Sequence, residues 1–316
     1  MRSLLLSLSF FTLLTGCNQN IPQSAADFPA IDTHVHLYDT TRPEGVPWPR
    51  PEHKILYKPI LPANFQPISD QNKVHAVVVV QAGSWTQDNQ WNLDITNQQP
   101  HLYQGIVGNL SLEIGKPSFT PIFNQLIKDK RYVGFRISSR PDPDNFKNPL
   151  FWEHLRQVAS NNKTIDILIG RSKSSYKLDD AIIIAEKNPN LKIIIDHVLA
   201  IPINAQPISE TNIAKAKKLA SFPNVHCKVS GLFGKSTIIP APKNHKHYAH
   251  NLNLVYETFG EDRLIFGSDW PVTMNHGSYI EHKDIIFQHF KSKGRSTLEK
   301  LFYKNATRFY NIPGIE

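Results

Sequence analysis

Cysteine is scarce in this sequence: only Cys17 and Cys227 occur among 316 residues. A disulfide scaffold and a cysteine-rich zinc module are therefore excluded. The chain also lacks a GxGxxG fingerprint or a phosphate-binding loop, the usual signs of nucleotide binding. The apolar run at residues 4–14 is shorter than the roughly 20 residues that a permanent membrane-spanning helix needs.

The remaining composition is that of an ordinary globular protein, with 40% hydrophobic, 20% charged and 10% aromatic residues. Such usage excludes disorder, collagen and coiled coil as the main state. Lys and Arg exceed Asp and Glu by 35 − 27 = 8, a balance that suits anionic sugars, a membrane surface or simply a generic basic surface. Nucleic-acid binding is not predicted, because no recognised module accompanies the charge.

The first 17 residues have the form of a targeting signal. A basic start, a short apolar run and the ending Leu14-Thr15-Gly16-Cys17 resemble a bacterial lipoprotein signal. The resemblance implies removal of residues 1–16, lipidation of Cys17 and a mature charge of 8 − 1 = +7. Asn18 after the cysteine suggests the periplasmic face of an outer membrane. Residues 17–29 are then expected to form a polar tether, and Cys227 a core thiol.

Beyond the tether, short apolar runs alternate with polar or helix-like stretches. Continuously apolar runs are typical of strands buried on both faces of a parallel sheet. Eight such units predict a single-domain α/β fold, a (β/α)8 TIM barrel over residues 30–312; a doubly wound open sheet is the alternative. The predicted strands are Ile31–His36, Val74–Gln81, Gly105–Leu110, Val133–Ile137, Ile165–Ile169, Lys192–His197, Val225–Val229 and Leu264–Ser268.

Polar residues stand where these predicted strands end, which in a barrel is the catalytic mouth. His34 and His36 are two residues apart, so both imidazoles lie on one side of the first strand. Asp269 ends the last strand and faces them, which suits a carboxylate that takes a proton from water. The other strand-end candidates are Arg136, a clamp for a carboxylate or carbonyl oxygen, together with His197 and Lys228.

These segments carry a family resemblance. Ile31-Asp32-Thr33-His34-Val35-His36 and Phe266-Gly267-Ser268-Asp269-Trp270-Pro271-Val272 resemble the first and last site strands of the amidohydrolase superfamily. Val133-Gly134-Phe135-Arg136, Lys228-Val229-Ser230-Gly231-Leu232 and the tail Asn305-Ala306-Thr307-Arg308-Phe309-Tyr310 resemble the amidohydrolase 2 group and its branch of sugar-lactone and pyrone-dicarboxylate lactonases. The resemblance implies a core site of His34, His36, His197 and Asp269, in which the Asp activates water.

Three features depart from the family pattern. No Lys stands in residues 134–140, which speaks against a binuclear metal centre. His197 is not followed closely by the Gly-Lys-Pro that is usual in the branch. Where the branch has a Glu a few residues before a Trp, this chain has Asp88 before Trp91; the alternative for both residues is capping and packing at the start of a helix.

The sequence thus predicts a hydrolase that opens a small-molecule lactone or sugar-acid derivative, with Asp269 as the base and His34, His36 and His197 around it. Either no cofactor is needed, or these four residues hold one divalent ion, expected to be Zn²⁺. Substrate contacts are predicted for Arg136, Lys228, Asp88 and Trp270. The alternatives are a metal-dependent decarboxylase or C–C hydrolase, and an inactive lipid-tethered binding protein.

Two further segments are open to interpretation. The long loop Tyr38–Asn72 follows the first strand and carries Trp48, so it either shapes the substrate pocket or only covers the surface. His245, His247 and His250 lack a matching carboxylate nearby. A solvated or sugar-contacting loop is therefore preferred to a metal site there.

Overall fold

The computed structural model describes residues 21–139, 144–170 and 172–315. The predicted signal peptide and lipidation site at residues 1–17 lie outside the described residues. In the described part of the chain, no helix is long and apolar enough to cross a membrane. Ala25 and Phe28 belong to the predicted tether but are buried, and the Phe28 ring lies 5.6 Å from those of Phe287 and Phe302.

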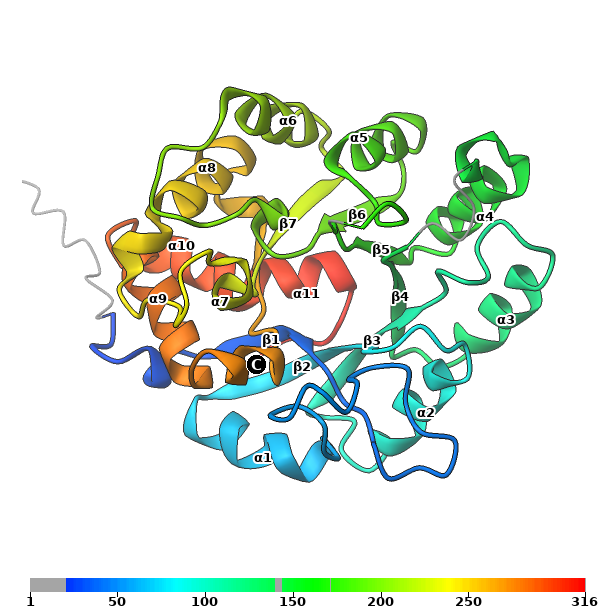
Figure 1. Cartoon of the computed structure of the whole chain (residues 1–316), viewed down its shortest axis with the longest axis horizontal. Coiled ribbons are helices and arrows are strands. Elements are labelled where there is room, and N and C mark those ends of the chain that lie inside the picture. Colours follow the sequence, from blue (N-terminus) through cyan, green and yellow to red (C-terminus); the bar gives the residue numbers. More distant parts are fainter. Residues whose placement is uncertain (1–20, 140–143, 171, 316) are drawn as a thin grey trace, which may run out of the picture.

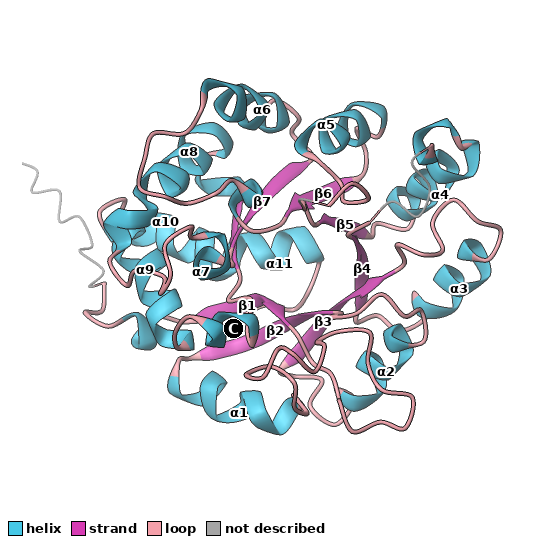
Figure 2. Cartoon of the chain, in the orientation of Figure 1, coloured by secondary structure: helices cyan, strands magenta, loops and turns pink. Residues whose placement is uncertain are grey.

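The fold is a single-domain (β/α)8 barrel, as predicted. Eight parallel strands follow one another in sequence order around the sheet, and helices surround them (Figures 1 and 2). The strands are β1 (Ala30–Val35), β2 (Val74–Val80), β3 (Tyr103–Asn109), β4 (Tyr132–Ile137), β5 (Thr164–Ile167), β6 (Lys192–Ile195), β7 (Val225–Val229) and β8 (Leu264–Phe266). Each lies within two residues of its predicted start.

The helices follow the strands in the order that the barrel requires. The helices are α1 (Pro62–Gln71), α2 (Asp88–Ile95), α3 (Phe119–Leu126), α4 (Pro149–Ser160), α5 (Leu178–Lys187), α6 (Glu210–Ala220), α7 (Leu232–Lys235), α8 (Ala249–Phe259), α9 (Tyr279–Lys291), α10 (Arg295–Glu299) and α11 (Asn305–Tyr310).

Two apolar layers explain why the strands are continuously apolar. On β2, Val77 and Val79 belong to the layer between sheet and helices, whereas Val78 and Val80 belong to the barrel interior. Phe309 and Tyr310 of α11 join that interior layer, and Figure 1 shows α11 lying within the ring of strands. The alternation of side chains along a strand therefore meets an apolar environment on both sides.

The barrel closes between β8 and β1 at the end where the candidate site lies. The backbone N–H of His36 donates to Trp270 O (2.8 Å), and that of Asp269 donates to His34 O (2.9 Å). Deeper in the barrel, at earlier residues of both strands, Thr33 Oγ1 donates to Phe266 O (2.7 Å). The closure therefore holds the predicted histidine pair directly beside the predicted aspartate.

Candidate active site

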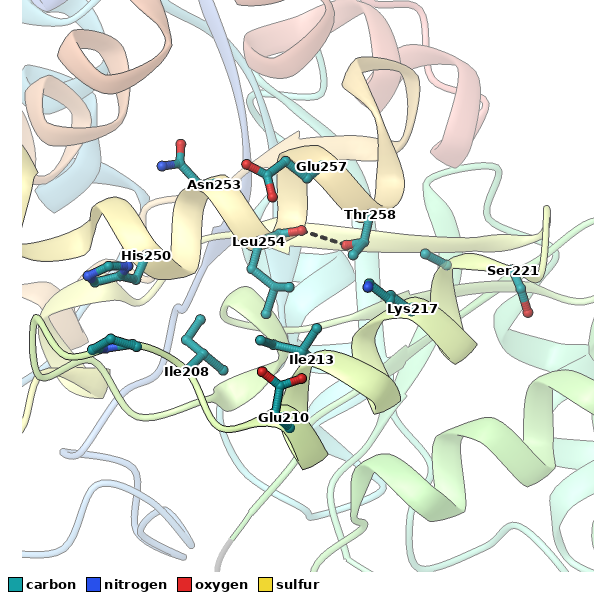
Figure 3. Close-up of a pocket in the computed structure, with 12 residues that line it drawn as sticks. Ile208, Glu210, Ile213, Lys217, Ser221, His250, Asn253, Leu254, Glu257 and Thr258 are labelled. Atoms are coloured by element: carbon teal, nitrogen blue, oxygen red, sulfur yellow. Dashed lines mark hydrogen bonds between the residues drawn. The ribbon is translucent and has the colours of Figure 1, made fainter.

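Several hollows mark the described surface, and a large one is remote from the predicted chemistry. It holds about 780 Å³ on the outer wall between α6 and α8. Figure 3 shows Glu210, Lys217, His250 and Glu257 around it, and Thr258 donating to Leu254 O. None of the predicted catalytic residues lines this groove, so size alone does not identify the active site.

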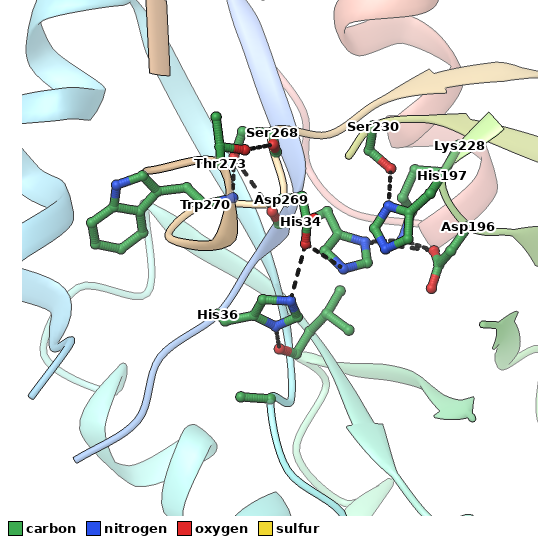
Figure 4. A network of polar contacts seen from close by, with 12 residues as sticks. His34, His36, Asp196, His197, Lys228, Ser230, Ser268, Asp269, Trp270 and Thr273 are labelled. Carbon is green, nitrogen blue, oxygen red and sulfur yellow. Dashed lines mark hydrogen bonds and ion pairs between the residues drawn. The ribbon is translucent and has the colours of Figure 1, made fainter. Parts of the chain in front are cut away.

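Another hollow, of about 480 Å³, opens at the carboxyl ends of the strands. His36, His197 and Asp269 line it, as does Arg136. His34 is completely buried and lies just behind them (Figure 4). This is where a barrel of this type places its active site. The strand-end residues predicted to form one site are therefore brought together.

Asp269 lies between His34, in β1, and His36, directly after that strand. Its Oδ1 is 3.3 Å from His36 Nε2 and 3.6 Å from His34 Nε2. The two rings are 4.9 Å apart and nearly perpendicular. Asp269 also has a left-handed backbone, with φ +62°, a conformation that a non-glycine residue keeps only when its surroundings hold it. The closure hydrogen bonds described above hold it here.

Asp32 stabilises this closure from within. It is fully buried, and its Oδ1 accepts hydrogen bonds from the backbone N–H groups of His34 (3.0 Å) and Ser268 (2.8 Å). Burial raises the pKa of the Asp32 carboxyl to about 6, against the lowering effect of these donors. One carboxyl therefore fixes the ends of both site strands.

His197 approaches from β6 in an unusual backbone. Residues 197–200 all have positive φ, between 46° and 63°, and none of them is glycine. Such a run is strained, at a cost of about 1–2 kcal/mol for each residue. The His197 ring is held by a 2.9 Å contact between Nδ1 and Ser230 Oγ and lies 4.6 Å from the His34 ring. Burial lowers its pKa well below the ordinary value.

Arg136 reaches the cavity from β4 with its guanidinium held by backbone oxygens. Nη2 donates to Gln81 O (2.7 Å) and to Ala82 O (3.2 Å). These anchors leave the side chain facing the hollow that it lines. Arg136 is therefore placed where a clamp on a substrate oxygen is expected.

Lys228 does not reach the cavity, contrary to the predicted substrate contact. The side chain is fully buried under the site, and Nζ lies 2.5 Å from Asp166 Oδ2 and 3.2 Å from Asp196 Oδ1. Burial lowers the pKa of Lys228, but the two carboxylates outweigh this effect and hold the pKa above its usual value. Lys228 is thus a buried ion-pair partner.

Asp88 and Trp270 also lie outside the cavity wall. Asp88 Oδ1 accepts from Arg42 Nη1 (2.9 Å), and the Arg42 guanidinium lies 5.0 Å over the Trp91 ring. This cluster fastens the long loop after β1 onto α2. Trp270 is nearly buried and packs on Phe65, 5.1 Å between ring centroids. The positions of both residues fit packing better than substrate contact.

The cavity contains residues that the sequence did not single out. Asn109 and Ser138 stand at the ends of β3 and β4, so the strand-end rule applied to every strand would have found them. Lys235 comes from the short helix α7, for which no periodic signal exists. Trp48, which the sequence did single out, also lines the hollow from the long loop, 5.9 Å from the His36 ring. The loop therefore shapes the pocket.

The histidines of residues 245–250 take no part in this cavity. His247 Nε2 contacts Ser236 Oγ (3.2 Å), and the His245 ring lies 6.5 Å from that of His289. His250 lines the outer groove instead. Among the described residues, the groups with metal-ligand spacing all include His34 and not this segment.

Comparison with known proteins decides the family. A profile of the amidohydrolase family, amidohydrolase 2, matches residues 31–312. The chain belongs to this amidohydrolase family. It is 27% identical over 291 residues to an L-fucono-1,5-lactonase of Burkholderia ambifaria, covering 89% of this chain and 95% of the relative. It is 28% identical over 204 residues to an L-rhamnono-gamma-lactonase of Scheffersomyces stipitis, covering 59% and 60%.

Solved structures of amidohydrolases share the fold. A crystal structure of an amidohydrolase from Burkholderia multivorans with bound zinc superimposes with a TM-score of 0.75 at 21% identity, over 90% of this chain and 100% of that one. A probable 2-pyrone-4,6-dicarboxylic acid hydrolase from Acinetobacter baumannii gives 0.68 at 19%, over 90% and 100%.

The donor set of this amidohydrolase fits one divalent ion. Ligand atoms of His34, His36 and Asp269 all lie within 4.8 Å of one another, and imidazole and carboxylate are ligands that Zn²⁺ uses. His36 Nδ1 is 2.6 Å from Val80 O, so it carries the hydrogen and leaves the Nε2 lone pair facing Asp269 Oδ1. His36 Nε2 and Asp269 Oδ1 are then two acceptors that face each other at 3.3 Å. A cation or a proton between them would satisfy both.

Proposed function

We propose that this amidohydrolase opens a lactone, specifically a sugar aldonolactone, by attack of an activated water. The observation that carries the proposal is the Asp269 carboxylate, held by the barrel closure at the wall of a cavity and flanked by imidazoles. A fixed carboxylate beside a polar cavity is the arrangement expected of a general base. The lactonase names of the relatives supply the substrate class.

The residues divide the reaction between them. Asp269 takes a proton from water as the water oxygen attacks the lactone carbonyl carbon. The ring C–O bond then breaks, and the proton passes from Asp269 to the leaving ring oxygen, which gives a hydroxy acid and restores the Asp269 carboxylate. His36 and His197 face the same cavity and orient the water and the carbonyl oxygen. Arg136, anchored by Gln81 and Ala82, stabilises the negative charge that develops on oxygen.

A divalent ion, when bound by His34, His36, His197 and Asp269, would supply Lewis-acid polarisation and a water of lower pKa. Sugar rings present polarised C–H faces, and Trp48 offers them an aromatic surface at the rim of the cavity. Asn109 and Ser138 add hydrogen-bonding groups for sugar hydroxyls. The lining therefore suits a polyhydroxylated ring better than an apolar ester.

The test is a panel of 1,4- and 1,5-aldonolactones, a pyrone dicarboxylate and hydroxylated aromatic carboxylates, assayed with and without a chelator. Turnover of an aldonolactone is expected. Turnover only of aromatic carboxylates, abolished by the chelator, would replace the proposal with a metal-dependent decarboxylase. Tight binding of lactones without turnover would replace it with a binding protein.

We also propose that the mature chain is lipid-anchored at the periplasmic face of the outer membrane. The proposal rests on Leu14-Thr15-Gly16-Cys17 and on Asn18, which resemble a lipoprotein signal. In a Gram-negative host, wild type is expected to fractionate with outer membranes, and Cys17→Ala to lose both the lipid and the membrane association. A Cys17→Ala chain that stays in the membrane fraction would contradict the anchor.

A further inference from the structure

A buried lysine lies beneath the histidine pair and makes contact with one of its rings. Lys228 Nζ is 3.3 Å from His34 Nδ1, 2.5 Å from Asp166 Oδ2 and 3.2 Å from Asp196 Oδ1. All four side chains are fully buried. Two carboxylates around one amine keep it an ammonium, which has three hydrogens to donate and no lone pair to accept with.

The ammonium restricts the hydrogen positions on His34. A neutral imidazole has one donor and one acceptor nitrogen. Because Lys228 can only donate, Nδ1 of His34 has to accept, and the ring hydrogen then stands on Nε2. Asp196 Oδ1 favours the opposite arrangement, but it lies farther from Nδ1, at 3.5 Å, and is itself paired with Lys228.

His36 has the opposite constraint. Its Nδ1 faces the carbonyl oxygen of Val80 at 2.6 Å, and a carbonyl only accepts, so the hydrogen of His36 stands on Nδ1. The two histidines thus present the same atom, Nε2, to Asp269, but in different protonation states. His36 offers a lone pair at 3.3 Å, and His34 offers an N–H at 3.6 Å.

We propose that Lys228 is a positioning residue that fixes His34 as the Nε2–H tautomer. In this form His34 directs a hydrogen toward the Asp269 carboxylate and withholds the lone pair that a metal ion needs. The chain therefore binds Zn²⁺ more weakly than its set of histidines and aspartate suggests. The proposal deepens the proposed function, because it assigns His34 to the support of the base, and its test does not depend on turnover.

The lysine is itself held from the far side of the barrel. Tyr310 on α11 donates its hydroxyl hydrogen to Asp166 Oδ2 (3.0 Å), the same oxygen that pairs with Lys228. The Tyr310 ring centroid is 5.8 Å from Lys228 Nζ. A contiguous chain of contacts therefore runs from the C-terminal helix through Asp166 and Lys228 to His34.

The direct test is the hydrogen position on His34 in the purified wild-type chain without added metal. Long-range proton–nitrogen NMR spectra of ¹⁵N-histidine-labelled protein distinguish the two tautomers, and His34→Gln and His36→Gln assign the signals. We expect His34 protonated on Nε2 and His36 on Nδ1, each serving as a reference for the other. A His34 ring protonated on Nδ1 would overturn the proposal.

A variant tests the cause. Lys228→Met combined with Asp166→Asn removes the ammonium together with one of its two carboxylates. His34 is then expected to move its hydrogen to Nδ1, facing Asp196, and the Zn²⁺ affinity measured by calorimetry to rise about 10- to 100-fold, the usual scale for groups behind a metal ligand. Unchanged tautomer and affinity in the folded variant would contradict the role of Lys228.

A matched control separates this effect from general destabilisation. Lys283 is the other fully buried lysine named in the described core, and it donates to Phe28 O and Asn72 O, with no contact to the site histidines. Lys283→Met should leave the His34 tautomer and Zn²⁺ affinity unchanged. If the double variant does not fold, the wild-type spectrum still decides. An inactive wild type with His34 protonated on Nε2 would contradict the proposed function alone.

Discussion

Gly231 offers a sharp perturbation of the site, because an added methyl group would push on two proposed catalytic residues. Its backbone is left-handed, with φ +59°, and a Cβ built on it would lie 2.5 Å from His197 Nδ1 and 3.2 Å from Asp269 Oδ2. Restoring an ordinary contact of about 3.5 Å requires a displacement of the His197 ring of about 1 Å. Misplacement on that scale costs about 10²-fold in rate.

Gly231→Ala should therefore lower kcat on the best lactone about 100-fold. The left-handed backbone adds about 1–2 kcal/mol of strain, which corresponds to a fall in Tm of about 2–4 °C per kcal/mol in a protein of this size. The assay is steady-state hydrolysis of the lactone beside thermal unfolding of the same samples.

Two other glycines separate the effect of backbone strain from the effect of the contact with His197 and Asp269. Gly260 has φ +70° and nothing within 4 Å of the built Cβ, so Gly260→Ala measures strain alone. Gly234 lines the cavity without such a φ and also meets nothing, so Gly234→Ala measures the substitution alone. Wild-type kcat in Gly231→Ala, or an equal loss in Gly260→Ala, would refute the contact-based reasoning.

Two more predictions concern stability. Burial lowers the pKa of His226 and His289 to about 4 and that of His282 to about 3, so the unfolded chain binds protons below about pH 6.5 that the folded chain does not. The free energy of unfolding in urea should therefore be lower at pH 5 than at pH 7. The buried carboxyls of Asp32 and Asp166, with pKa values raised to about 6, oppose this trend but are outnumbered by the three histidines. Equal or higher stability at pH 5 would contradict the prediction. Asp88→Asn weakens the nearly buried pair with Arg42 and should cost about 1–3 kcal/mol in the same measurement, with kcat unchanged; a loss of kcat would instead place Asp88 in the chemistry.

The fold was predictable because it depends on patterns that the sequence carries in full. Residues 76–80 of β2 are apolar at consecutive positions, and only a sheet covered on both faces buries such a run. The same logic located His34, His36 and Asp269, since a strand end in a barrel has a known place.

The site residues that the sequence misplaced or missed have a common physical cause. Alternation along β7 tells which side of the strand Lys228 occupies but not how deep it lies along the barrel axis, and the partners that bury it come from β5 and β6. Trp270 turns away from the cavity after the last strand and packs on Phe65 of α1. Lys235 enters from the short helix α7, a segment without a periodic signal.

The most direct test of the central claim is the hydrolysis of the best aldonolactone by wild type and by Asp269→Asn. The asparagine keeps the shape of the side chain and its neighbours but cannot take a proton from water, so kcat should fall about 10²- to 10⁴-fold while KM stays near the wild-type value. Unchanged kcat in a correctly folded Asp269→Asn would contradict the account, because it would remove the proposed base from the reaction.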